Sequence, residues 1–135
     1  MGSRANIAVL QPKRSEEKRE AVFLYGHWIG PEMANALQTA LKKKWRWDDH
    51  SYLTRIIFDE VLHEHGTETG YGISTYLCDN NYPILVVDCE RKLVGIFNEG
   101  DEDISVFRRQ KTFEEFIALD DPQAFMLNAG DDDDE

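Results

Sequence analysis

The stretch NNYPILVVDCERKLVGIF, residues 80–97, contains two apolar runs that are separated by a charged pair. The asparagine pair near its start tolerates the left-handed conformations of a tight turn, and Glu90-Arg91 is expected at the tip of a hairpin. The run ILVVD, residues 84–88, is almost continuously apolar, which is typical of a strand that is covered on both faces. We therefore predict a central strand there, paired with KLVGIF at 92–97 in an antiparallel meander.

Two helical patterns precede this hairpin. Gly30-Pro31 marks a helix start, because proline at the first helical position gives up only an N–H that has no partner there. The following PEMANALQTALKKKW, residues 31–45, places an apolar residue at every fourth position up to Trp45. A second pattern, DHSYLTRIIFDEVLHEH, begins after a capping aspartate, Asp48 or Asp49, and ends at Gly66. We expect both helices to cover one face of the sheet.

Shorter elements are predicted on either side of these. ANIAVLQ (5–11) and AVFLY (21–25) have the composition of strands, so residues 1–20 form either an N-terminal strand or a flexible arm. Strands are also expected at ISTYLCD (73–79) and VFRRQ (106–110). FEEFIAL (113–119) follows a capping-box spacing from Thr112 to Glu115 and predicts a short last helix.

These elements predict an α+β fold with one domain at residues 21–122. The domain would have an antiparallel sheet of about four to five strands, two consecutive helices packed on one face, and a short C-terminal helix. A chain of 135 residues has the usual size of a single domain. Residues 123–135 end in Asp131, Asp132, Asp133, Asp134 and Glu135 and are predicted to be an acidic, disordered tail.

Charge is unevenly distributed along the chain. Residues 1–56 carry ten Lys/Arg against six Asp/Glu, and residues 57–135 carry five against twenty, which gives the net charge of −11. Such a surface disfavours nucleic acid and anionic membranes and favours basic partners. No apolar run approaches the roughly 18 residues that span a bilayer, and the N-terminal residues lack the apolar stretch of a signal peptide. We expect a cytoplasmic protein.

Metal, cofactor and catalytic motifs are weak. Cys78 and Cys89 are interpreted as small buried side chains, with a disulfide or metal site as the alternative. The H-E-x-x-H order of zinc proteases is absent around His63 and His65. KKKWRW, residues 42–47, interleaves cations and aromatics as nucleic-acid binders do, but lysines also suit a helix C-terminus. We predict no metal, no cofactor and no catalytic residue.

TETGYGIST, residues 67–75, is the candidate ligand loop. Its glycines permit close backbone approach, its hydroxyls offer hydrogen bonds, and its tyrosine offers a stacking face. His27 and Trp28 lie next to the predicted helix start, where free N–H groups hold anions. The alternative is that the glycines only turn the chain and that Trp28 packs over the helix. The predicted ligand-binding residues are His27, Trp28, Thr69, Gly70, Tyr71, Gly72, Ser74 and Thr75.

The combination of YGHWIG, RWDDHSYLTRIIF, ETGYGIST and NNYPILVVD resembles a group of small proteins encoded by bacteriophages and actinobacterial genomes. The similarity covers roughly residues 21–97. It implies no reaction, but it implies a context in which short proteins bind a host protein or sequester a small signal. The acidic loop and tail lie outside the matched region.

Three functions follow as hypotheses. The first is a non-enzymatic acidic interaction protein, such as a phage-type inhibitor, that binds the basic face of a host protein. The predicted partner-binding residues are Glu99, Asp101, Glu102, Asp103, Asp131, Asp132, Asp133, Asp134 and Glu135. The alternative is a module that binds or sequesters a nucleotide-like or other anionic small molecule at the predicted ligand-binding residues. A small hydrolase is the third class, and no oligomeric state is predicted.

Overall fold

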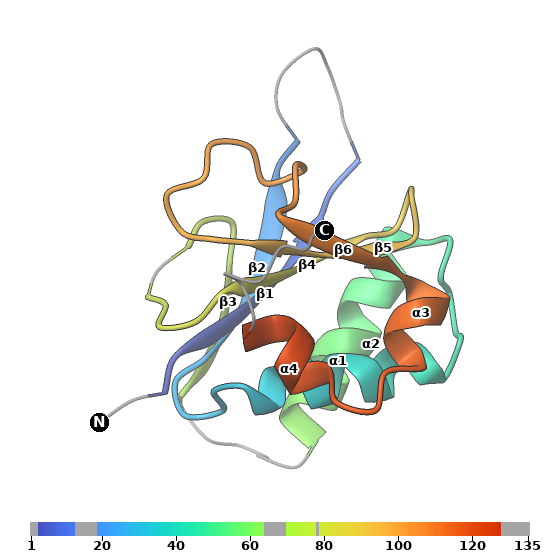
Figure 1. The fold of residues 1–135 in the computed structure, drawn as a ribbon, viewed down its shortest axis with the longest axis horizontal. Helices are drawn as coiled ribbons and strands as arrows, with labels where there is room; N and C mark the ends of the chain where they lie inside the picture. Colours follow the sequence, from blue (N-terminus) through green and yellow to red (C-terminus); the bar gives the residue numbers. More distant parts are fainter. Residues whose placement is uncertain (1–2, 13–18, 64–69, 78, 128–135) are drawn as a thin grey trace.

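The computed structural model describes residues 3–12, 19–63, 70–77 and 79–127. In these residues a six-stranded sheet is combined with helices in an α+β arrangement (Figure 1). The strands are β1 (Ala5–Leu10), β2 (Ala21–Gly26), β3 (Tyr71–Ser74), β4 (Ile84–Asp88), β5 (Leu93–Phe97) and β6 (Arg109–Thr112). The helices are α1 (Glu32–Lys42), α2 (His50–His63), α3 (Phe113–Ile117) and α4 (Pro122–Leu127). No helix of this described part is long and apolar enough to cross a membrane.

The strand order is β3-β2-β1-β4-β5-β6, and the sheet is mostly antiparallel. The α+β class is confirmed, with more strands than predicted. The predicted antiparallel pairing of 84–88 with 92–97 is confirmed by β4 and β5. The expectation of an antiparallel sheet is wrong for one pair of strands, because β4 also pairs in parallel with β1. The strand expected at 73–79 is β3, which ends at Ser74 and pairs with β2 at the edge of the sheet. All residues of β1 and β4 are buried. β1 and β4 lie side by side in the centre of the sheet, where both faces of each strand are covered. β3 is partly exposed and lies at the edge.

The helices lie on one side of the sheet, as predicted (Figure 1). α1 buries Met33, Leu37 and Leu41 at intervals of four residues, and α2 buries Leu53 and Ile57. Together with apolar residues of the strands, α3 and α4, these side chains form what we call the helix-side core. Amphipathic helices bury their apolar stripe against the sheet. This burial stabilises the folded state by about 25 cal/mol per Å² of apolar surface.

Trp45 does not complete the stripe of α1 as predicted. The helix ends at Lys42, Lys44 has a φ of 58°, and the Trp45 side chain is 59% exposed. Trp47, which is half-buried, packs against the helix-side core instead, with its ring edge-to-face against Phe113 at 5.1 Å between centroids. The left-handed residue turns the chain, so the apolar spacing ends one turn earlier than the sequence suggests.

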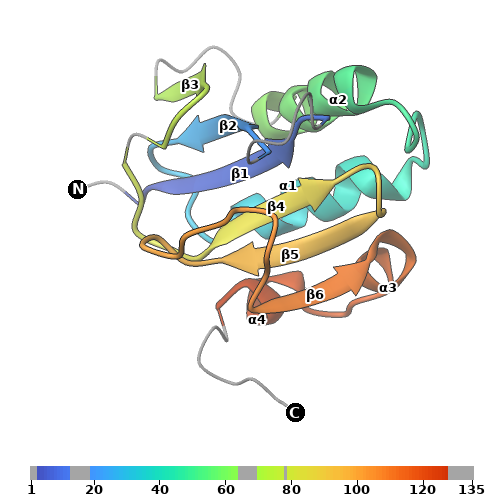
Figure 2. The same ribbon diagram turned by 90° about the horizontal axis from the view of Figure 1, so that it is seen from above.

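The opposite side of the sheet has a smaller core, which we call the loop-side core. It consists of Ala8, Leu10, Ala21, Phe23, Ile84, Val86 and Phe97. Its cover is provided by Leu77 and by Ile104 and Phe107 from the loop between β5 and β6. This loop, residues 98–108, is called the acidic loop below, and Figure 2 shows it passing in front of the sheet.

The C-terminal part differs from the prediction in its boundaries. The strand expected at 106–110 is β6, which begins later, at Arg109. The capping box is present: Thr112 accepts from the N–H of Glu115, whose carboxylate accepts from the N–H of Thr112. The prediction of a disordered tail is wrong for residues 123–127, which belong to helix α4, because Phe125 and Met126 pack into the helix-side core. The acidic residues 131–135 lie outside the described residues.

Candidate functional site

The acidic loop is folded by its own carboxylates. The side chain of Asp101 accepts hydrogen bonds from Nε and Nη2 of Arg108 at 3.0 and 2.8 Å and from the N–H of Asn98 at 3.0 Å. Asp103 accepts from the N–H and the hydroxyl of Ser105 at 3.0 and 2.7 Å. The bond from Arg108, and then the one from Asn98, lower the pKa of Asp101 below its usual value. The loop therefore holds a defined shape.

A cavity of about 440 Å³ opens on this loop. Its lining consists of Asp101, Glu102, Asp103, Val106, Phe107 and Arg108. Val106 is 64% exposed, and Glu102 of the same lining is exposed as well. Glu99 is exposed too, and it lines a separate hollow of this loop together with Asn98. Carboxylates next to apolar surface suit a lysine or arginine side chain, whose stem packs on carbon while its head meets the acid.

The loop is attached to the sheet at two points. A Cβ at Gly95 of β5 would overlap the ring of Phe107, so the absence of a side chain lets this ring lie on the strand. The guanidinium of Arg91 lies 5.4 Å from the centre of the same ring and donates to the carbonyl of Ser105 at 2.8 Å. Both contacts fix the acidic residues relative to the sheet.

Arg91 also binds the buried carboxylate of Asp88, at 2.6 Å from Nε, and Arg19 binds it at 3.0 Å. Burial by itself raises the pKa of Asp88, but hydrogen bonds from Arg91 and Arg19 outweigh it, and the pKa lies below its usual 3.8. Asp88 therefore has a structural role, because its carboxylate binds Arg19 and Arg91 and holds these two segments together.

The predicted ligand residues His27, Trp28, Gly70 and Tyr71 come together at one end of β2 and β3. The N–H of His27 donates to the carbonyl of Gly70 at 2.8 Å, and the rings of His27 and Trp28 meet edge-to-face at 4.8 Å. A Cβ at Gly70 would overlap the indole of Trp28. The indole thus occupies the space above Gly70 that a ligand would need.

The other predicted ligand residues that the structure describes, Gly72, Ser74 and Thr75, do not join this cluster. Tyr71 packs against the helix-side core, whereas Ser74 pairs with Phe23 of the loop-side core, so strand alternation turns the two side chains to opposite faces. Gly72 has open space around it and Thr75 is exposed. Thr69 lies outside the described residues.

A negative charge lies at the helix start where the sequence predicts an anion site. Glu32 is the first residue of α1 and is exposed in its first turn. A carboxylate there interacts favourably with the helix dipole and repels a second anion. The start of α1 is therefore a poor place for an anionic ligand.

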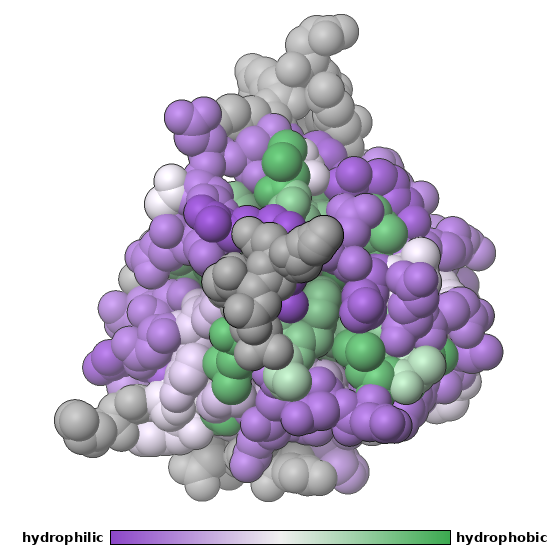
Figure 3. Space-filling model, in the orientation of Figure 1, coloured by the Kyte–Doolittle hydropathy of each residue, from purple (hydrophilic) through white to green (hydrophobic). Residues whose placement is uncertain are grey.

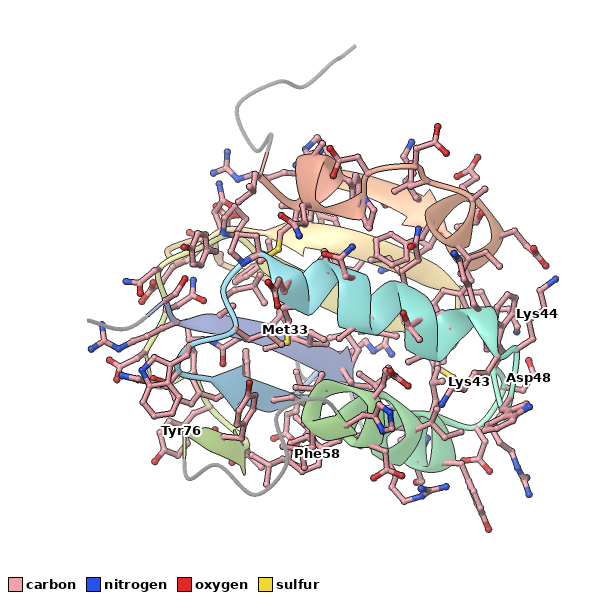
Figure 4. The ribbon with its side chains drawn as sticks, turned by 90° about the horizontal axis from the view of Figure 1, so that it is seen from below. Met33, Lys43, Lys44, Asp48, Phe58 and Tyr76 are labelled. Carbon is pink, nitrogen blue, oxygen red and sulfur yellow. The ribbon has the colours of Figure 1, made fainter. Side chains whose placement is uncertain are left out.

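A second cavity, of about 570 Å³, was missed from the sequence. It is lined by Lys44, Arg46, Trp47, Asp48, Asp49 and Lys92, and we call it the basic corner. Figure 4 shows Lys44 and Asp48 beside each other at this corner. The KKKWRW pattern pointed to part of it, but Lys92 lies far away in sequence and is brought in by the turn between β4 and β5.

The cysteine prediction can be followed for one of the pair. Cys89 is buried, its thiol donates to the carbonyl of Trp47 at 2.7 Å, and burial raises its pKa to about 11. A thiol with so high a pKa is a weak nucleophile. Cys78 lies outside the described residues. Among the described residues, no group of three or more His, Cys, Asp or Glu side chains could hold a metal ion.

Comparisons with known proteins assign no family. No protein-family model, no curated protein and no solved structure matches the chain. The resemblance to phage and actinobacterial proteins stays a prediction. The functional argument therefore depends on the geometry of the sites.

Proposed function

We propose that this protein is a non-enzymatic interaction protein that binds a basic segment of a partner at the acidic loop. The observation that carries the proposal is the fixed shape of this loop, in which exposed Glu102 lines a hollow together with Val106 and Phe107, and Glu99 is exposed in the same loop. A preorganised surface loses little conformational entropy on binding, which favours affinity.

The net charge of −11 supports a basic partner, because an acidic protein attracts cationic surfaces over several ångströms and speeds their association. The surface seen in Figure 3 is largely hydrophilic, with small apolar areas. Asp101 and Asp103 are half-buried, whereas Glu99 and Glu102 are exposed, so the partner would meet chiefly Glu99 and Glu102. An inhibitor of a host protein, as the resemblance implies, would act by covering the host's basic face.

A fluorescent peptide of alternating arginine and leucine serves as the probe. We expect it to bind at low salt, to weaken steeply between about 50 and 200 mM salt, and to shift the amide NMR signals of the acidic loop. The double variant Glu99→Gln/Glu102→Gln should weaken binding roughly tenfold, as expected for the loss of two charge-assisted contacts. Val106→Ser should weaken it less.

The matched control is Glu32→Gln/Asp120→Asn, which removes the same charge from exposed positions on the helix side. It should change the affinity by less than about twofold, because distant charges are screened. Equal weakening by both double variants would show unspecific attraction to an acidic protein. A complex insensitive to salt would contradict the proposal outright.

The alternative of a ligand-binding module has one observation in its favour, the convergence of Trp28 with Gly70 and Tyr71. For a ligand to enter, the indole of Trp28 would have to swing away, and its 53% exposure permits that movement. Trp28→Ala would then raise affinity for a small anion such as AMP, whereas loss of packing alone would leave AMP unbound.

A further inference from the structure

The basic corner contains every left-handed residue other than glycine in the described part of the chain. Lys44, Arg46 and Lys92 have φ values of 58°, 59° and 56°. This conformation costs an L-residue with a Cβ roughly 1 to 2 kcal/mol, and glycine adopts it freely. Three cations thus occupy backbone positions where glycine would be more stable.

All three line the same cavity, although they come from two separate turns. Lys44 and Arg46 belong to the link between α1 and α2, and Lys92 ends the turn between β4 and β5. Strained residues are enriched at functional sites, where a side chain is needed despite its backbone cost. The turns alone explain the conformation, but not the choice of a long cationic side chain at each position.

The side of the cavity that lies between the two turns is held in place by several hydrogen bonds and a ring contact. The indole N–H of Trp47 donates to the carbonyl of Leu41 at 3.1 Å, and its ring meets Phe113 edge-to-face. The carbonyl of Trp47 accepts from Cys89, and the carbonyl of Lys92 accepts from the N–H of Phe113 at 2.9 Å. These bonds join the two turns, so the cavity exists without a ligand.

The charges of the corner favour a small anion. Lys92 binds Asp48 at 2.5 Å, and this carboxylate is 86% exposed, so it can be displaced. Lys44 is 3.6 Å from Glu114 at the surface, a distance at which an ion pair contributes little. Asp49 accepts from the N–H of Ser51 at 3.2 Å and caps α2, so it stays in place.

We propose that the basic corner binds a small phosphate monoester that carries hydroxyl groups, such as a sugar phosphate. The phosphate takes the place of the Asp48 carboxylate among Lys44, Arg46 and Lys92. Ammonium and guanidinium groups donate to phosphate oxygens in this way. Asp48 and Asp49, as acceptors, are left for the hydroxyls, and Trp47 supplies an apolar wall.

A nucleic-acid strand fits the corner less well. Exposed Trp45 and Tyr52, with Lys43 over one ring and Arg46 over the other, offer stacking faces. A strand, however, needs a continuous basic track, whereas Glu60 binds Lys43 and further carboxylates flank the cavity. The cavity volume of about 570 Å³ lies in the range of small-molecule sites.

The test uses ribose 5-phosphate as the probe, with ribose and inorganic phosphate for comparison, and measures thermal shift and titration calorimetry. We expect ribose 5-phosphate to raise the Tm and to bind at least tenfold more tightly than inorganic phosphate, and ribose to give no shift. Lys44→Gly/Lys92→Gly should weaken binding at least a hundredfold, as expected from two lost charged contacts. Because glycine relieves the backbone strain, this variant should keep or raise the Tm of the free protein.

Two single variants make the result specific. Asp48→Asn removes the competing carboxylate and should tighten phosphate binding severalfold, an outcome that a merely structural role of Asp48 would not produce. Lys42→Gln, an exposed cation next to the corner but outside its lining, should change affinity by less than about twofold.

The proposal is overturned if ribose 5-phosphate gives no shift at 10 mM, or if it binds the double glycine variant as tightly as the parent chain. It is also overturned if a single-stranded oligonucleotide binds more than tenfold more tightly than the sugar phosphate, because the corner would then be part of a nucleic-acid surface. Loss of peptide binding at the acidic loop would not affect this outcome.

Discussion

The helix-covered and loop-covered faces of the sheet are both buried, but different interactions hold their covers in place. On the helix side, four helices contribute large apolar side chains, among them fully buried Phe113 and Phe116. On the loop side, a few apolar residues are supplemented by ion pairs of Asp88 with Arg91 and of Asp101 with Arg108. Most apolar burial is thus on the helix side of the sheet, and the acidic loop, the proposed partner-binding surface, lies on the other side.

This difference has a consequence for the acidic loop. Apolar packing changes little with pH or salt, whereas partly exposed ion pairs weaken when carboxylates are protonated or screened. The loop cover should therefore open before the molecule unfolds, as regions with few buried contacts do. Four variants test whether the two faces behave as differently as their contacts suggest.

The largest effect is expected on the helix side. Phe116→Ala removes a side chain that is fully buried and lies edge-to-face with Phe125 at 5.9 Å. It should lower the free energy of unfolding by about 3 to 5 kcal/mol, through lost transfer energy and the cavity left behind. Urea denaturation at pH 7 and pH 5 measures it, and the loss should be equal at both. A loss below about 1 kcal/mol would show that the α3 region is not part of the core.

Asp88→Asn tests the buried anchor of the loop side. It should cost about 2 to 3 kcal/mol at pH 7, because two guanidinium groups lose a charged partner. The pKa of Asp88 in the folded protein lies below the unfolded value near 3.8, so its contribution is present above that pH and is lost as the pH falls through the folded pKa.

Unfolding curves of both proteins between pH 7 and pH 2 measure this effect. The two curves should converge below about pH 3.8. A difference that stays constant over this range would mean that the charge of Asp88 is not what stabilises the fold.

Gly95→Ala tests the contact between β5 and the acidic loop. The added methyl group would overlap the ring of Phe107, so the ring must move, at a cost of about 1 to 3 kcal/mol. Hydrogen exchange should become faster for amides of the acidic loop and stay unchanged in α1 and α2. Binding of the arginine-leucine peptide should weaken as well. Gly72→Ala is the matched control, since that position has open space around it.

Arg108→Gln should have the smallest effect. It removes the bidentate partner of Asp101, an ion pair near the surface that is expected to contribute less than about 1 kcal/mol to the free energy of unfolding. The pKa of Asp101 should rise, because the hydrogen bond from Arg108 is the main cause of its lowering. NMR titration of the carboxyl carbon measures this, and an unchanged pKa would contradict the pairing.

The fold could be predicted where a pattern is local. The four-residue spacing of Met33 and Leu37 specified a helix, and the capping box at Thr112 specified where α3 begins. The pairing of β1 with β4 could not be predicted, because it joins residues 78 positions apart, such as Ile7 and Leu85, and no local signal encodes that partnership.

The sites follow the same division. The sequence brought His27 and Trp28 together with Gly70 as candidates, and the structure places them side by side. The sequence could not reveal that the indole of Trp28 fills the space above Gly70, since this depends on side-chain packing. Nor could it reveal the basic corner, which needs Lys92 to meet Lys44 across two turns.

By itself the sequence determined the α+β class, the apolar central strand at 84–88 and the excess of negative charge, because these follow from composition and periodicity within short windows. Only the tertiary structure decided the strand order, the loop that covers the second face, and the meeting of three strained cations in one cavity. The physical reason is that these features arise from contacts between distant segments, whose energies no single window of sequence contains.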